Sequence, residues 1–418
     1  MNHTQRRWAS VAAALLFSAA AFAGTFPDAH ESAPAGWTGH VFRLSQAYPT
    51  TPPSADARPW QEYDVKKEPE QYIAAVYKYV LAGNIEVDWE VDRNAVRKWY
   101  HAPWMHTGDN GREFVHGLTR ERTTPAPAAG KSGELGPSQT QCAQNWAVGF
   151  YNAPGGYIVG QVWANPIAPD AGKSRFPDGT VVAKLLFTAA PIAQVPYLAG
   201  SYEWQANIHV IPKTDTKCQT RGARAVQTVR LLQMDLAIRD TSAHTTTEWV
   251  FATYTFDGTK SGTSPWAKMV PVGVMWGNDP SLTPTTFAAG QRVMETWVNS
   301  RLKTLQHLGW LGRLDGPVDN ASSSCLSCHA TGQVPASSPM LPPAGSVESV
   351  QMRWFLNYPA ATPFDSTSVS TDYSLQLAAG IQAFRAASQP GGFAALTGRS
   401  KGIDGINKAR EYVVSRGD

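Results

Sequence analysis

The sequence has 418 residues, with 36 Lys or Arg against 33 Asp or Glu, so its formal net charge is only +3. This balance, without a basic patch interleaved with aromatic side chains, argues against a nucleic-acid-binding protein. The length exceeds one typical domain, and the 35 Gly, 30 Pro and 15 Trp are typical of a turn-rich β protein with aromatic packing.

The first 23 residues have the parts of a secretory signal peptide. Arg6 and Arg7 precede an apolar stretch at 9–23, which ends in the small-x-small pattern Ala-Phe-Ala. About 15 apolar residues are too few to cross a bilayer, which takes about 20, although an N-terminal anchor helix is the alternative. No later stretch is long and apolar enough to span. We therefore predict export to the periplasm, removal of residues 1–23, and a mature chain without a membrane span.

The N-terminal part of the mature chain predicts an extended segment and then a helix. Residues 29–59 are rich in proline and polar side chains, which favours an irregular surface segment. Between 70 and 81, Tyr72, Ile73 and Val76 recur at helical spacing, and Gly83 ends the pattern.

The middle of the chain changes to the pattern of strands. Several runs rich in β-branched and aromatic residues are bounded by turn signals such as the Pro-Asp-Gly at 177–179. The runs are 157–164, 180–188, 203–211, 226–239 and 248–256. Because no helical pattern separates them, we predict an α+β protein that is mainly antiparallel β, either a sandwich or an open barrel.

The last third predicts helices again. Residues 287–308 carry Met294, Trp297 and Leu302 at helical spacing, and 372–387 has a similar pattern. We therefore predict a β-rich body at 24–284, which includes the N-terminal helical segment, and a helical segment at 285–418 that carries the motif described next.

The sequence Cys325-Leu326-Ser327-Cys328-His329 is the attachment motif of a c-type haem. Each cysteine can add its sulfur across a vinyl group of the porphyrin, and the histidine can ligate the iron. The alternatives are zinc or a redox thiol pair. A zinc site calls for a second ligand pair, and a thioredoxin-type pair follows a buried strand, whereas 319–324 is polar. We predict one haem c per chain, held by Cys325, Cys328 and His329.

Two cysteines stand apart from this motif. Cys142 and Cys218 are distant from it and from each other in the sequence. In an oxidising compartment the simplest interpretation is one disulfide, and two free buried thiols are the alternative.

The second axial position of the iron decides the function. Met340, in a proline-rich loop eleven positions after His329, is the first candidate ligand, because that length of chain reaches up to about 35 Å. A loop methionine that only packs is the alternative. Met352 is a weaker candidate, and Met294 is expected in the core. Three histidines lie within sixteen residues of one another, and any of them is a further candidate: His101, His106 and His116.

The order of several segments resembles a known family. Asn165-Pro166, the stretch 176–184, the strand 249–254 and the late haem motif follow the order found in periplasmic β-rich cytochromes whose haem c is cross-linked to a lysine and which oxidise hydroxylamine. The resemblance covers about 156–332, and it implies that Lys184 is the cross-linking lysine. A solvated lysine on a sheet is the alternative. More broadly, the chain resembles large bacterial single-haem cytochromes.

These observations lead to one predicted function and two alternatives. If a protein side chain occupies the second axial position, the iron is closed to substrates, and we predict an electron carrier that serves a periplasmic redox partner protein. An open distal face predicts a haem oxidoreductase that acts on a small nitrogen or oxygen compound. A haem-based ligand-binding or sensing protein is the third class. The large β body keeps both alternatives open, because small electron carriers have far fewer residues.

Overall fold

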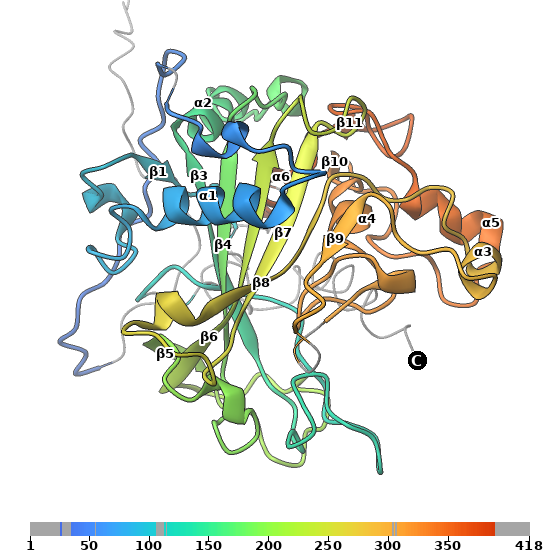
Figure 1. The fold of residues 1–418 in the computed structure, drawn as a ribbon. Coiled ribbons are helices and arrows are strands. Elements are labelled where there is room, and N and C mark those ends of the chain that lie inside the picture. Colours follow the sequence, from blue (N-terminus) through green and yellow to red (C-terminus); the bar gives the residue numbers. More distant parts are fainter. Residues whose placement is uncertain are drawn as a thin grey trace, which may run out of the picture.

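A broad antiparallel sheet is the framework of the protein in the computed structural model (Figure 1). The structure describes residues 26, 35–54, 56–105, 113, 115–302, 305 and 307–388. The predicted signal peptide lies outside these residues. Nine strands form the sheet, in the order β1-β3-β4-β6-β7-β8-β9, with β2 also paired to β3 and β5 also paired to β6. A second sheet consists of β10 and β11 alone.

The strands of the large sheet are β1 (Trp99–Tyr100), β2 (Thr119–Arg120), β3 (Asn145–Asn152), β4 (Val181–Thr188), β5 (Glu203–His209), β6 (Arg224–Arg239), β7 (Trp249–Phe256), β8 (Met269–Met275) and β9 (Thr296–Val298). The small sheet pairs β10 (Gln333–Val334) with β11 (Val369–Ser370). The helices are α1 (Pro69–Leu81), α2 (Ala153–Val162), α3 (Pro284–Ala288), α4 (Cys325–His329), α5 (Glu348–Gln351) and α6 (Leu375–Ala387). The predicted class, α+β and mainly antiparallel β, is confirmed, and the sheet is open.

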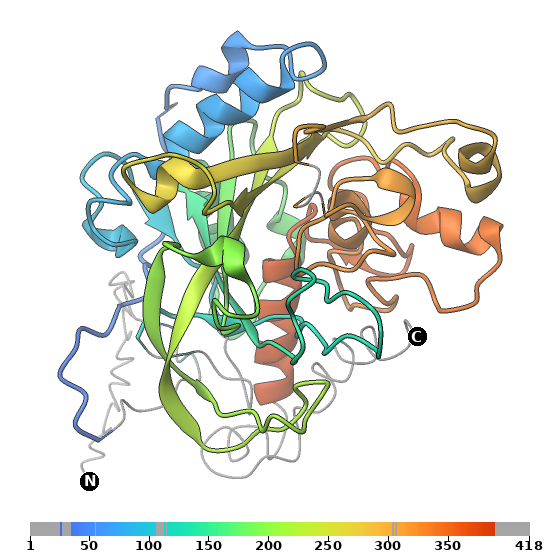
Figure 2. The ribbon, with the colours of Figure 1, turned by 60° about the horizontal axis from the view of Figure 1, so that its bottom comes forward.

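Both faces of the central strands are covered. Successive side chains of a strand point to opposite faces, and on β7 Val250 belongs to one hydrophobic core and Phe251 to the other. The first core also contains the buried side of α1, and the second contains that of α6. Figure 2 shows α6, in red, beside the orange segments, and α6 contacts β10 of those segments. All eight residues of β7 are buried, because it lies between these two layers.

Most of the predicted regular elements in the described chain are confirmed, but the strand predicted at 157–164 is wrong. These residues belong mainly to α2, which begins after Asn152. The Asn152 side chain accepts a hydrogen bond from the backbone N–H of Gly155, and a proline stands in the first turn. Ile158 and Val162 are buried on one face at i and i+4. The capping outweighs the β propensity of the apolar side chains.

The long helix predicted at 287–308 is also wrong. Helix α3 ends at Ala288, Gly290 follows with a φ of +100°, and β9 then pairs with β8. Met294 is 76 % exposed rather than part of the core. Its backbone N–H donates to the carboxylate of Asp279, so tertiary hydrogen bonds replace helical ones. Strand β9 lies beyond the predicted boundary at 284, and the two predicted parts therefore share one sheet.

Two of the longer strands, β3 and β8, were not predicted, and neither were the short strands β1, β2, β9, β10 and β11. Strand β3 carries Gly149, and β8 carries Pro271 and Gly273, residues that normally mark turns. Pro271 stands opposite Tyr254 at a register shift between β7 and β8, where a missing N–H is tolerated.

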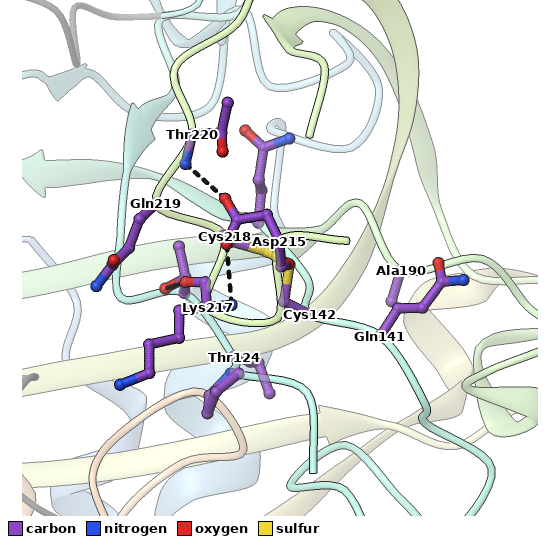
Figure 3. The surroundings of a disulfide bond; sticks show 12 residues. Thr124, Gln141, Cys142, Ala190, Asp215, Lys217, Cys218, Gln219 and Thr220 are labelled. Atoms are coloured by element: carbon purple, nitrogen blue, oxygen red, sulfur yellow. Dashed lines mark hydrogen bonds between the residues drawn. A yellow bond between two sulfur atoms is a disulfide. The ribbon is translucent and has the colours of Figure 1, made fainter. Parts of the chain in front are cut away.

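The predicted disulfide between Cys142 and Cys218 is confirmed (Figure 3). It ties the chain before β3 to the loop between β5 and β6. The Asp215 carboxylate orders that loop by accepting hydrogen bonds from the backbone N–H groups of Lys217 and Thr220. Within the described part of the chain, no helix is long and apolar enough to cross a membrane.

We expect the variant with Cys142→Ser and Cys218→Ser to have a free energy of unfolding about 4 kcal/mol lower than the wild type, because the bond closes a loop across a sequence separation of 76 residues. Denaturation in guanidinium chloride without reductant measures this difference. The wild type with reductant is the matched control and should show the same loss. An unchanged denaturation midpoint would contradict the prediction.

Candidate functional site

The five motif residues form a helix of their own. Helix α4 is a single turn, and Ser324 and Ser327 close a capping box at its start, with backbone-to-hydroxyl distances of 3.0 and 2.8 Å. The Ser324 hydroxyl also donates to the Asn278 side chain at 2.7 Å, which fixes α4 to the loop after β8. Because Cys325 and Cys328 are three positions apart in a helical turn, their sulfurs lie on the same face. Neither is in a disulfide.

That face borders a cavity of about 1010 Å³. The cavity lies over the sheet face that packs against α6 in the second hydrophobic core. It is bounded by α4, by α6 and by the loop at 336–341. Its apolar wall consists mainly of Tyr151, Phe176, Val182, Trp249, Phe251, Leu341, Tyr373 and Ala378. The motif therefore faces a large space with aromatic side chains on its walls.

The Tyr373 backbone oxygen and the Phe251 ring contact the imidazole of His329. Its Nδ1 lies 2.7 Å from the backbone oxygen of Tyr373, and the Phe251 ring is 4.6 Å from the imidazole, centroid to centroid. A carbonyl oxygen only accepts, so Nδ1 carries the proton and Nε2 keeps its lone pair. Burial lowers the pKa of His329 to about 4, against the opposing effect of the Tyr373 oxygen. Its ring is therefore neutral at neutral pH, which is the form that can ligate a metal.

Lys184 lies in the same cavity. It is on β4 directly opposite Asp235 of β6, and its Nζ is 3.5 Å from a carboxylate oxygen of Glu121. Only 27 % of its side chain is exposed. The structure thus brings Lys184 to the cavity that α4 faces, although no local sequence pattern links the two.

Carboxylates gather on the wall nearest the two thiols. Asp235, Asp315 and Asp319 all line the cavity, and Gln233 Nε2 donates to both Asp235 and Asp319 at 2.6 and 2.9 Å. Burial, with repulsion from Asp319, raises the pKa of Asp235 to about 7 and that of Asp315 well above its usual value. This wall therefore holds protons at neutral pH that an exposed aspartate would release.

The two thiols share this environment. Burial and the neighbouring Asp315 raise the pKa of Cys328 to about 12 and move that of Cys325 in the same direction. Both sulfurs are therefore protonated at neutral pH.

Met340, the first predicted axial ligand, also lines the cavity and is half-buried. Met352 packs instead against the cluster of Trp354, Phe355 and Phe364. Met105 and His307 line the cavity as well, and neither was predicted from the sequence. Neither residue stands in a recognisable motif in the sequence, so no spacing pattern could have identified it.

The predicted histidine group does not gather at the cavity. His101 Nδ1 accepts from the backbone N–H of Ser45 at 2.9 Å, and its ring packs on Phe150 in the first core. The His116 ring stacks on Trp204 with centroids 3.9 Å apart. Neither ring is part of the cavity wall. His106 lies outside the described residues.

No cluster of three or more His, Cys, Asp or Glu side chains in the described ranges is arranged to hold a metal ion. No family model matches this chain, and neither a curated protein nor a solved structure matches it.

We expect Asp235→Asn to raise the free energy of unfolding of the apoprotein by about 1–2 kcal/mol at pH 8. The pKa of Asp235 is about 7 in the folded protein and 3.8 ordinarily, so between these values the unfolded chain loses this proton and the folded protein keeps it. The wild type therefore loses stability as the pH rises from about 4 to 7. Chemical denaturation at pH 8 and at pH 3.5 measures the difference, which should nearly vanish at the lower pH.

Asp365→Asn is a control of opposite sign. Hydrogen bonds from Ser337 and Arg353 outweigh burial and lower the pKa of Asp365 to about 2. This variant should be less stable than the wild type at pH 8 and approach it only as pH falls toward 2. If Asp235→Asn were also destabilising at pH 8, the proposed repulsion in the cavity would be wrong.

Proposed function

We propose that the protein is an exported c-type cytochrome that carries one covalent haem and transfers electrons to a periplasmic redox partner protein. The observation that carries this proposal is the common orientation of Cys325, Cys328 and His329 toward one large cavity. Export is inferred from the N-terminal sequence, and the confirmed disulfide is typical of an oxidising compartment.

The residues of the cavity fit a haem. Its volume of about 1010 Å³ is at the upper end of the range for ligand sites, which is about 300–1,000 Å³. The aromatic side chains of Trp249, Phe251 and Tyr151 suit the faces of a flat macrocycle. Arg120 and Arg221, also on the wall, suit the two carboxylates of a porphyrin.

Each protein group has a defined task in this proposal. The thiols of Cys325 and Cys328 would form thioethers by adding S–H across the vinyl groups, and His329 Nε2 would ligate the iron. The bound haem supplies one-electron redox chemistry. Phe251 and the Tyr373 oxygen orient the imidazole. The apolar wall excludes water from the site.

Met340 favours electron transfer over catalysis. Its thioether belongs to the cavity wall, in a segment of Ser, Pro and Leu neighbours that restricts the backbone. A methionine that occupied the second axial position would close the iron to substrates and raise its potential.

The position of Lys184 favours a second candidate, a haem oxidoreductase with an open distal face that acts on a small nitrogen or oxygen compound. The resemblance to the lysine-cross-linked cytochromes singles out this residue, and it lies in the same cavity as the haem motif. The adjacent Asp235, with a pKa of about 7, could hold or release a proton near that face at neutral pH.

Periplasmic expression with a cytochrome c maturation system tests the common part of both candidates. We expect the mass of the denatured protein to exceed that of the mature chain by one haem. Cys325→Ala with Cys328→Ala should abolish this increase, whereas Cys142→Ser with Cys218→Ser should retain it. A denatured wild type without covalent haem would overturn the proposal.

Optical spectra of the reduced protein separate the two candidates. For the electron carrier we expect a low-spin spectrum that carbon monoxide does not change, and Met340→Ala should open the iron and make the spectrum sensitive to carbon monoxide. Met352→Ala is the matched control and should behave as the wild type. A wild-type spectrum that shifts with carbon monoxide, together with a peptide in which Lys184 is joined to the haem, would favour the oxidoreductase.

A further inference from the structure

The side chain of Asp372 is a hydrogen-bonding centre just outside the cavity. It is fully buried and pairs with Arg239 at the end of β6, whose Nη1 is 3.1 Å from Oδ1. It also accepts from the backbone N–H of Phe176 at 2.8 Å and from that of Ala361 at 2.9 Å. Trp249 Nε1 of β7 donates to it at 3.3 Å. Donors from four separate segments therefore fix one carboxylate.

The backbone at this position has an uncommon conformation. Asp372 has a φ of +48° and Tyr373 a φ of +65°, so two successive residues other than glycine are left-handed. This region is disfavoured for L-residues, and especially for a bulky one such as tyrosine. It persists only where surrounding contacts determine it. The donors to the Asp372 carboxylate are those contacts, with the Tyr373 hydroxyl donating to the Tyr358 oxygen at 2.7 Å.

This conformation determines where the Tyr373 carbonyl points. Its oxygen is the acceptor for His329 Nδ1 at 2.7 Å. The neighbouring bonds hold the same turn, because Thr371 N–H donates to the Gly332 oxygen at 2.8 Å and the Thr371 hydroxyl donates to the Ser374 oxygen at 2.7 Å. A change at Asp372 is thus passed to the histidine through the backbone of the next residue, Tyr373.

We propose that Asp372 is a positioning residue for His329: by holding residues 372–373 in the left-handed conformation, it aims the Tyr373 carbonyl at Nδ1 and so fixes the orientation and basicity of the imidazole. The inference rests on the proposed function only for its consequence at the iron. A strong hydrogen bond at Nδ1 makes the ring a better donor through Nε2, which stabilises ferric iron and lowers the reduction potential.

Asp372→Asn tests this proposal, because it keeps the size of the side chain and removes the charge that Arg239 and the N–H donors require. We expect the His329 Nδ1 proton, followed by NMR in the apoprotein and in the haem-loaded protein, to exchange with water about tenfold faster than in the wild type. In the haem-loaded variant we expect a higher reduction potential. Exchange and potential equal to those of the wild type would overturn the inference.

Asp365→Asn is the matched control. Asp365 is also a carboxylate with several hydrogen-bond donors in the same C-terminal segment, among them the hydroxyls of Ser337 and Ser338 at 2.7 and 2.9 Å. This variant should lose stability yet leave the exchange of the His329 proton unchanged. Faster exchange in both variants would mean that general destabilisation of the C-terminal segment is the cause, and would contradict a specific role of Asp372.

A second variant and a measurement on the apoprotein cover the cases in which Asp372→Asn does not fold or no haem is bound. If Asp372→Asn fails to fold, Arg239→Lys is the second variant, because it retains a cation but removes guanidinium N–H donors that face Asp372. We then expect a smaller increase in the exchange rate of the His329 proton. No increase would overturn the inference. If the wild type carries no haem, the proposed function fails. The exchange measured in the apoprotein still decides whether Asp372 positions His329.

Discussion

The alternation of side chains along β4, β6 and β7 is the constraint on which the site depends. Each of these strands contributes one set of residues to the core beneath α1 and the other set to the cavity face. On β4, Ala183 is buried in the first core while Lys184 faces the cavity, and on β7 Val250 and Phe251 divide in the same way. A shift of one residue in register would exchange the two faces and turn Lys184, Asp235 and Phe251 away from the cavity.

The same constraint explains why so large a β body accompanies a motif of five residues. Helix α4 is a single turn and cannot by itself enclose a cavity of about 1010 Å³. The sheet supplies one wall, α6 supplies another, and Asp372 with Arg239 joins the C-terminal segment to the end of β6. The fold therefore holds the motif residues against side chains that come from distant parts of the sequence.

Charge within the cavity is distributed unevenly, and this has chemical consequences. The thiols lie near carboxylates whose pKa values are raised by burial and by mutual repulsion, as for Asp235 and Asp315. Lys184 stands opposite Asp235 on the neighbouring strand and forms its ion pair with Glu121. Asp235, with a pKa of about 7, can take up or release a proton near neutral pH, which suits the proposed proton-coupled reaction as well as the proposed electron transfer.

The sequence by itself determined the motif of Cys325, Cys328 and His329, helix α1 and most of the central strands, because spacing and composition encode them directly. The pairing of Cys142 with Cys218 followed from the only two cysteines outside the motif and the predicted oxidising compartment. It misplaced α2 and β9, where a cap and the edge of a sheet overrode local propensity. Only the tertiary structure decided that Lys184 joins the motif while His101 and His116 do not. Strand order and register determine which distant residues meet, and no local pattern carries that information.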